Sequence, residues 1–390
     1  MKIDQIIAKS IISAGAEIVT CVPGFGGTQV FQSYANLMGQ SPVFSFHEEV
    51  AYASAFGAAI AGKRSAFLTK VHGLAKAANA ATDSLYMSLT GAMVVFVFED
   101  EQGSHSDNIM FAEPLLQGLR MPYFIPEKDN IAAQVYLAFE KSAARKIPVA
   151  LVLNAEMVNE DGAFFECKNK LPTKPFTRDL LSLMVVPVFA DYQFKVMNTK
   201  IEGRDFENIP KPAIPEIPGG LPPDYAKYVK PYMPLMKVFK ELRGEIVFGD
   251  TGISTLFAFP PFACVDACSY MGGSVAMALG AIEAGYKNCW AVTGDFSFIA
   301  AGHLGLLEAV SKNIPVKILI FKNNKAQTTG GQIFDENLLN RILAGFGEFV
   351  IEINDSDDET TKRKLLQRAA NADKIQIVIA NYSNNNGFKN

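Results

Sequence analysis

The stretch that decides the fold is residues 290–332, which read W-A-V-T-G-D-F-S-F-I-A-A-G-H-L-G-L-L-E-A-V-S-K-N-I-P-V-K-I-L-I-F-K-N-N-K-A-Q-T-T-G-G-Q. One apolar run ends at Asp295, a helical pattern follows, and a second apolar run ends at Asn324. Parallel strands joined by a right-handed helical crossover lie side by side and end at the same sheet edge. The pattern therefore predicts that Asp295 and Asn324 meet there as oxygen ligands suited to Mg²⁺. Alone, the pattern is more typical of an ordinary βαβ unit with polar strand ends.

The spacing of these residues separates the two interpretations. The Gly-Asp-Phe triplet and the asparagine pair are separated by the 26 residues 297–322. This resembles the signature of the thiamine-diphosphate-dependent enzymes, which have Gly-Asp-Gly, an interval of this length, and then Asn-Asn. The resemblance implies that Asp295, Asn324 and the backbone carbonyl of Ala326 hold Mg²⁺ against the diphosphate. Phe296 departs from the family pattern, because a glycine or another small residue usually stands there.

Composition indicates a well-packed globular protein. The 390 residues suffice for two or three domains, and 49% of them are hydrophobic while 19% are charged. A net charge of −4 argues against a nucleic-acid partner. The amino terminus lacks the apolar core of a signal peptide, and no apolar run approaches the roughly 20 residues needed to cross a bilayer. We therefore expect a cytoplasmic protein without membrane or nucleic-acid partners.

The five cysteines bear on the choice of reaction. Their spacing fits neither a C-x-x-C pair nor an iron–sulfur cluster, and their odd number gives no disulfide framework; they are Cys21, Cys167, Cys264, Cys268 and Cys289. We expect reduced and mostly buried thiols, and no cluster in this chain.

Alternating strand and helix patterns predict two doubly wound α/β domains with mainly parallel sheets. Residues 1–160 form the first domain, with six strands expected at 16–22, 43–46, 65–71, 92–98, 122–126 and 148–154. Residues 161–240 are expected to be an extended Pro-rich connector, because eight of the 20 prolines lie between Pro210 and Pro234. The alternation returns over residues 241–390, with strands expected at 245–248, 291–293, 316–321, 349–353 and 375–380.

The first domain carries a second motif. The run H-E-E-V-A-Y-A-S-A-F-G-A-A begins at His47 and resembles the His-Glu-x-x-Ala stretch of the thiamine enzymes' pyrimidine-binding domain. The resemblance implies that Glu48 bonds to N1′ of the cofactor and favours the tautomer that removes the C2 proton. Without it, an acidic pair at a helix start indicates only a favourable interaction with the helix dipole. His47, His72 and His105 end expected strands and are candidate proton carriers, although a lone histidine is more often structural.

Five further motifs refine the resemblance: V-T-C-V-P-G, F-E-D-E-Q-G-S-H-S, G-D-T-G-I-S-T-L, D-A-C-S-Y-M-G-G-S-V and Q-T-T-G-G-Q. They resemble the large subunits of indolepyruvate:ferredoxin oxidoreductases, whose middle and cysteine-rich ferredoxin-like domains we do not expect here. In layout the chain is similar to phosphonopyruvate and sulfopyruvate decarboxylases. The resemblance implies a pyrimidine-binding domain at 1–160 and a diphosphate-binding domain at 241–390.

The same resemblance implies thiamine diphosphate and Mg²⁺ as cofactors. Val275 is expected to be the aliphatic side chain beneath the cofactor, although the family usually has a larger one. The residues implied to bind the cofactor are Glu48, Thr251, Gly252, Met271, Gly273, Val275, Gly294, Asp295, Phe296, Ser297, Asn324, Ala326, Gln327 and Thr328.

Three functions stay open. A small 2-oxo acid substrate would lose carbon dioxide and leave an enamine on the cofactor. In a decarboxylase or carboligase, the enamine is protonated or attacks an acceptor, and we favour this non-oxidative lyase or transferase because no cluster is expected. Alternatively, a separate iron–sulfur subunit receives its electrons, or the protein binds the cofactor without catalysis, as Phe296 and Val275 suggest. A homodimer or dimer of dimers is implied, since the family places the cofactor between domains of two subunits.

Overall fold

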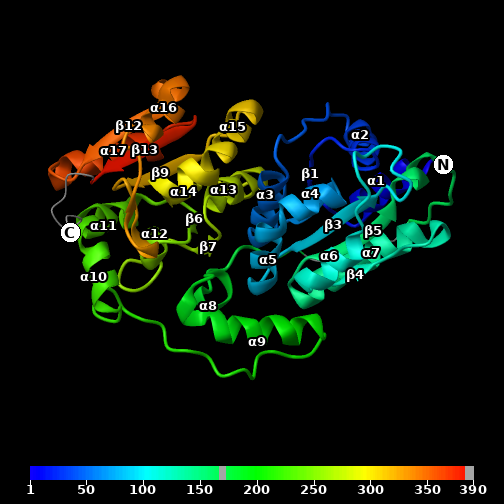
Figure 1. The fold of residues 1–390 in the computed structure, drawn as a ribbon, viewed down its shortest axis with the longest axis horizontal. Coiled ribbons are helices and arrows are strands. Elements are labelled where there is room, and N and C mark those ends of the chain that lie inside the picture. Colours follow the sequence, from blue (N-terminus) through cyan, green and yellow to red (C-terminus); the bar gives the residue numbers. More distant parts are fainter. Residues whose placement is uncertain (167–172, 383–390) are drawn as a thin grey trace. The chain divides into compact units, whose positions relative to one another are not determined.

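A computed structural model of the protein describes residues 1–166 and 173–382 (Figure 1). The chain divides into two compact units. The N-terminal unit is Met1–Thr177 with Gln193–Ile209, and the C-terminal unit is Arg178–Tyr192 with Pro210–Asn390. Each unit contains one parallel sheet flanked by helices, so the predicted α/β class is confirmed. Over the described ranges, no helix combines the length and the apolar character that crossing a membrane requires.

The N-terminal unit is built on a five-stranded parallel sheet of order β1-β2-β3-β5-β4. Its central strand is buried along nearly its whole length, as expected for a parallel sheet covered on both faces. The strands are β1 (Ile18–Cys21), β2 (Arg64–Lys70), β3 (Ala92–Glu99), β4 (Tyr123–Phe124) and β5 (Val149–Asn154). The helices are α1 (Ile3–Ser13), α2 (Gly27–Leu37), α3 (Glu48–Ile60), α4 (Val71–Lys76), α5 (Ala78–Tyr86), α6 (Ala112–Leu119) and α7 (Ile131–Arg145).

The strand predicted at residues 43–46 is absent. This segment is irregular, and its apolar side chains Val43 and Phe46 are exposed. The backbone N–H of Ser45 donates to the carbonyl of Cys21 at 2.9 Å, but no strand pairing follows. The prediction was wrong because only Phe44 of the three apolar side chains packs against the core, while Val43 and Phe46 are exposed.

The C-terminal unit is built on a six-stranded parallel sheet of order β12-β13-β9-β8-β6-β7. Its strands are β6 (Val247–Asp250), β7 (Ala267–Ser269), β8 (Trp290–Gly294), β9 (Lys317–Lys322), β12 (Val350–Asn354) and β13 (Gln376–Asn381). β7, only three residues long, was not predicted. A separate antiparallel hairpin pairs β10 (Lys325–Ala326) with β11 (Gln332–Ile333). The helices of this part are α12 (Ile253–Leu256), α13 (Gly273–Glu283), α14 (Asp295–Ser297), α15 (His303–Lys312), α16 (Leu338–Leu343) and α17 (Glu359–Ala370).

Four α-helices lie in or begin in the described part of the segment predicted as an extended connector, which belongs to both units. They are α8 (Leu180–Leu183), α9 (Ala190–Ile201), α10 (Pro223–Val229) and α11 (Met233–Leu242). Pro223 and Pro234 lie in the first turns of α10 and α11, where a missing N–H is tolerated. Lys200 of α9 is buried and donates to the Ser88 hydroxyl at 2.6 Å, which fixes this helix to the N-terminal unit. Pro223 and Pro234 therefore mark helix starts, whereas the prolines from Pro210 to Pro222 lie in an irregular stretch, so the prediction of an extended segment was wrong only where these helices form.

Candidate active site

The shared edge of β8 and β9 brings the sequence motif together. The two strands pair in parallel, with Gly294 opposite Phe321. Asp295 follows β8, and one of its oxygens, Oδ2, accepts hydrogen bonds from the backbone N–H groups of Asn323 at 2.9 Å and Asn324 at 2.6 Å. The carboxylate thus bridges the two strand ends. Asn324 has a left-handed backbone at φ 57°, a conformation that asparagine adopts more readily than most residues.

The buried position of Asp295 disfavours the ionised form of its carboxylate. It is 2% exposed, and burial raises its pKa to about 6, although backbone N–H groups of Asn324, Asn323 and Phe296 and the charge of Lys322 oppose this rise. Burying a carboxylate is unfavourable unless an opposite charge or a metal compensates it. A divalent cation would provide that compensation, so the chemistry of this donor fits Mg²⁺.

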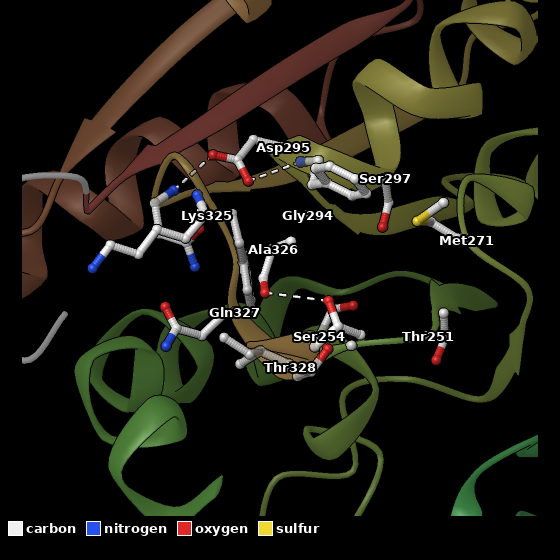
Figure 2. Close-up of a pocket in the computed structure, with 16 residues that line it drawn as sticks. Thr251, Ser254, Met271, Gly294, Asp295, Ser297, Lys325, Ala326, Gln327 and Thr328 are labelled. Atoms are coloured by element: carbon white, nitrogen blue, oxygen red, sulfur yellow. Dashed lines mark hydrogen bonds between the residues drawn. The ribbon is translucent and has the colours of Figure 1, made fainter. Parts of the chain in front are cut away.

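A pocket of ≈ 130 Å³ opens beside Asp295 (Figure 2). Figure 2 shows Met271 and Ser297 on one side of it and Gln327 on another. It brings together ten residues predicted to bind the cofactor: Thr251, Gly252, Met271, Gly294, Asp295, Phe296, Ser297, Ala326, Gln327 and Thr328. Asn323 and Lys325 also line it and were not predicted.

Two glycines shape the wall of this pocket. A Cβ added at Gly252 or Gly294 would meet no atom within 4 Å, so it would project into open space. Gly252 also has φ 132°, which other residues rarely adopt. Backbone exposed in this way allows close approach of a ligand such as a diphosphate. The pocket wall therefore fits the predicted group.

The structure does not bring Val275 into the pocket. Val275 is fully buried in α13, and the position of a Cβ on Gly305 would lie 2.9 Å from its Cγ1, so it packs against α15. The turn at Gly272, with φ 88°, precedes the buried helix and leaves Met271 37% exposed in the pocket. Met271 is thus the long apolar side chain available to a ligand.

Three other predicted cofactor residues also differ from expectation. Gly273 does not line the pocket and packs against the ring of Tyr270. Asn324 contributes its backbone N–H to Asp295, while its neighbour Asn323 lines the pocket. The carbonyl of Ala326, expected to bind the metal, accepts hydrogen bonds from the Gly331 N–H at 3.0 Å and from the Thr329 hydroxyl at 3.4 Å. Both lone pairs of this carbonyl are therefore engaged, and a metal would have to displace the longer bond.

Asp250 is a site-positioning residue that the sequence reasoning missed. It ends β6 and is fully buried, and burial raises its pKa. Its carboxylate accepts hydrogen bonds from the Ser274 N–H at 2.8 Å and from the Thr293 hydroxyl. It therefore ties the start of α13 to β6 and β8. An aspartate at the end of a predicted strand was the available signal.

The N-terminal unit has a pocket of its own, of ≈ 310 Å³, at the carboxyl ends of its strands. Three of the four predicted catalytic residues line it, namely Glu48, His72 and His105. His47 directly precedes α3 and does not line the pocket. The structure therefore groups three of these four side chains.

Glu48 offers an available acceptor in this pocket. Its Oε2 is buried and forms no hydrogen bond of good geometry with any described residue. Lys76 Nζ lies 2.9 Å from the same oxygen, which is ion-pair distance without hydrogen-bond alignment. A Cβ at Gly73 would lie 2.8 Å from Glu48 Cγ, so this close approach requires glycine. A carboxylate with spare accepting capacity fits a partner such as a ring nitrogen of the cofactor.

The cysteines in the described ranges are buried thiols, namely Cys21, Cys264, Cys268 and Cys289. Burial raises the pKa of Cys264 and of Cys289 to about 12 each, which keeps these thiols protonated. Cys167 lies outside the described residues. Across residues 1–166 and 173–382, no three His, Cys, Asp or Glu side chains are grouped to hold a metal.

Comparison with known proteins gives a match for the C-terminal unit. Residues 250–349 match the family described as thiamine pyrophosphate enzyme, C-terminal TPP binding domain. The chain is also 27% identical over 188 residues to the indolepyruvate oxidoreductase subunit IorA of Methanothermobacter thermautotrophicus. That match covers 44% of this chain and 30% of the relative, so the chain matches about a third of that relative's length. The resemblance to thiamine-diphosphate enzymes is confirmed.

Solved structures with the same fold cover nearly the whole chain. A thiamine diphosphate-dependent 4-hydroxybenzoylformate decarboxylase from Rhodococcus jostii RHA1 has a TM-score of 0.67 at 13% identity, covering 98% of this chain and 99% of that one. A benzoylformate decarboxylase from Polynucleobacter necessarius has a TM-score of 0.65 at 11% identity, covering 97% and 98%. At these identities the similarity establishes the fold alone.

Proposed function

Residues 250–349 match a thiamine pyrophosphate-binding domain, and from this premise we propose that the protein is a non-oxidative 2-oxo acid decarboxylase or carboligase that uses thiamine diphosphate and Mg²⁺. The observation that carries the proposal is the Asp295 carboxylate. It is buried where β8 and β9 end, holds the asparagine backbone, and lies beside the pocket that gathers the predicted cofactor residues. This arrangement supports binding of a metal-bound diphosphate.

The chain's own residues would share the chemical work. When bound, thiamine diphosphate would supply the electron sink for the loss of carbon dioxide. Asp295 would hold the cation, and Glu48 would bond to the pyrimidine nitrogen through its available Oε2. Met271 would give the apolar support that was expected of Val275. His72 and His105 would move protons at the substrate, the usual role of histidine in general acid–base catalysis.

The non-oxidative outcome is supported by two features. The cysteines lack the sequence spacing of an iron–sulfur cluster. The N-terminal pocket contains two histidines that could return a proton to the product carbon. An aldehyde or a new carbon–carbon bond would then be the product. We also propose a homodimer or dimer of dimers, on the family resemblance.

A second candidate function is the thiamine subunit of a 2-oxo acid:ferredoxin oxidoreductase. The 27% identity to the IorA subunit over 188 residues favours it. This function requires a separate iron–sulfur subunit, so reduction of a viologen dye would appear only after co-purified partners are added. A third candidate, a catalytically silent binding protein, would bind the cofactor without exchange of its C2 proton.

The proposal is tested by carbon dioxide release from a panel of 2-oxo acids with thiamine diphosphate and Mg²⁺, without an electron acceptor. We expect turnover of at least one acid by the wild type and a loss of about 100-fold or more in Asp295→Asn. Asp161→Asn, a substitution of the same type at a mostly exposed carboxylate, is the control and should retain activity. No release from any acid by the wild type would contradict the proposed function.

A further inference from the structure

The two histidines of the N-terminal pocket have partners of different charge. His72 Nε2 lies 2.6 Å from Asn108 Oδ1, which belongs to a neutral amide. His105 Nε2 lies 3.2 Å from Glu156 Oε1, which belongs to a carboxylate. A carboxylate compensates the positive charge of a protonated imidazole, whereas an amide does not. Of the two histidines, His105 is therefore the one whose Nε2 edge faces a charged partner.

The ring of His105 is fixed by its stacking partner. It stacks on Phe25, with centroids 3.7 Å apart and an interplanar angle of 22°. Phe25 belongs to the glycine-rich turn between β1 and α2, so the contact joins two loops of one sheet edge. Stacking restricts the tilt of the imidazole but leaves its rotation within the ring plane unspecified.

The backbone of His105 is held as firmly as its ring. Its N–H donates to Asp100 Oδ2 at 2.7 Å, and its carbonyl accepts from Lys70 Nζ at 2.6 Å. Asp100 is buried, and the Lys70 side chain is 16% exposed, so both partners are well ordered by their surroundings. These contacts place the histidine at the pocket but do not select which ring nitrogen faces a ligand.

Glu156 determines which ring nitrogen of His105 can face a ligand. It lies in the short 3₁₀ helix Ala155–Asn159 directly after β5, and its N–H donates to Asn154 Oδ1 at 2.9 Å. The capped turn holds the carboxylate opposite the Nε2 edge of His105. Both side chains are partly exposed, and such pairs contribute little to stability. The contact matters for orientation, because the partner of one ring nitrogen sets the tautomer of the other.

We propose that Glu156 is a positioning residue that holds the Nε2 edge of His105, so that Nδ1 delivers a proton to the substrate. This proposal rests on the proposed decarboxylation. The substrate's carbon–carbon bond to its own carboxylate group breaks, and that group leaves as carbon dioxide. The electron pair of the broken bond is finally used to form a C–H bond with the proton from Nδ1 of His105. His105 is left neutral, with its remaining proton on Nε2 facing Glu156. Water then reprotonates Nδ1, and no oxidant is consumed.

The test compares Glu156→Gln, Glu156→Asp and the matched control Glu160→Gln. Glu160 follows the same helix and pairs with Lys128 at 2.5 Å, outside the pocket. Glu156→Gln should lower kcat for carbon dioxide release about 10- to 100-fold and change KM less than about twofold. Glu156→Asp should recover part of the loss, and Glu160→Gln should match the wild type.

A second readout does not depend on activity. ¹⁵N spectra of the full-length protein, labelled at histidine and free of cofactor, report which ring nitrogen carries the proton. The His105 signals, assigned by their loss in His105→Asn, should show the Nε2–H tautomer in the wild type and a mixture in Glu156→Gln.

Two results would overturn the proposal: wild-type kcat in Glu156→Gln, or His105 signals that this substitution leaves unchanged. If the wild type itself releases no carbon dioxide, the proposed function fails. The nitrogen signals then still decide whether Glu156 orients His105.

Discussion

The buried carboxylate of Asp295 determines how the stability of the cofactor-free protein should change with pH. Its pKa is raised from 3.8 to about 6 by burial in the folded protein, whereas the unfolded chain keeps the ordinary value. Between these values the folded protein binds a proton that the unfolded chain has released. The contribution of this carboxyl group to stability is therefore fully present below pH 3.8 and is lost as pH rises through about 6. At about 1.4 kcal/mol per pKa unit, the ionised carboxylate costs about 3 kcal/mol.

Urea unfolding of the wild type and of Asp295→Asn between pH 4 and pH 8 isolates this effect, because asparagine does not titrate. The free energy of unfolding of the variant, minus that of the wild type, should rise by about 2.4 kcal/mol from pH 4 to pH 8, because part of the total of about 3 kcal/mol lies below pH 4. Hydrogen bonds lost by the asparagine shift the whole curve without changing its slope. Asp161→Asn is the control: hydrogen bonding to Lys2 lowers the pKa of Asp161 below 3.8, so its effect on stability falls below about pH 4 and its difference should stay nearly flat from pH 4 to pH 8.

A flat or falling difference for Asp295→Asn would refute the reasoning that burial dominates at this carboxylate. The Asp295→Asn variant also tests whether the destabilising carboxylate serves to bind Mg²⁺ and the cofactor. At pH 7.5, Mg²⁺ and thiamine diphosphate at about 100 times the dissociation constant should stabilise the wild type by about 2.7 kcal/mol. The variant should gain far less.

Four further substitutions test the walls of the two pockets. Met271→Ala should weaken thiamine diphosphate binding in calorimetry. Val275→Ala should lower the free energy of unfolding in urea by about 1–3 kcal/mol and leave binding unchanged, because Val275 is buried away from the pocket. Weaker binding in Val275→Ala and unchanged binding in Met271→Ala would contradict the assignment of Met271 to the pocket. Lys76→Met should tighten cofactor binding about two- to fivefold at low salt and not at high salt, because the Lys76 ammonium pairs with Glu48 Oε2. Weaker binding by this variant would refute the idea that Lys76 competes with the cofactor for Glu48. Gly252→Ala should reduce cofactor affinity about tenfold or more, since its Cβ would enter the pocket at φ 132°, and unchanged affinity would exclude close approach there.

Much of the architecture could be predicted because parallel strands buried on both faces appear as continuous apolar runs. β8 and β9 show this, and their polar ends at Asp295 and Asn324 meet as expected. The segment at residues 43–46 contains similar residue types, yet Val43 and Phe46 are exposed. So short a run does not reveal which side chains a neighbouring element will cover.

Other features depend on geometry that spacing does not encode. Prolines between residues 210 and 234 were compatible with an extended chain and with helix starts; helices form at Pro223 and Pro234, whereas residues 203–222 contain no helix. The turn at Gly272 decides that Met271, and not Val275, lines the pocket. Glu156 and His105 are 51 positions apart, and only the folded sheet brings their side chains to 3.2 Å.

The most direct test of the central claim is a calorimetric titration of the protein with thiamine diphosphate at pH 7.5, once with Mg²⁺ and once with a chelator. We predict saturable binding at one site per chain with Mg²⁺, and loss of that binding with the chelator and in Asp295→Asn. No binding by the wild type, or equal binding under all three conditions, would contradict the account.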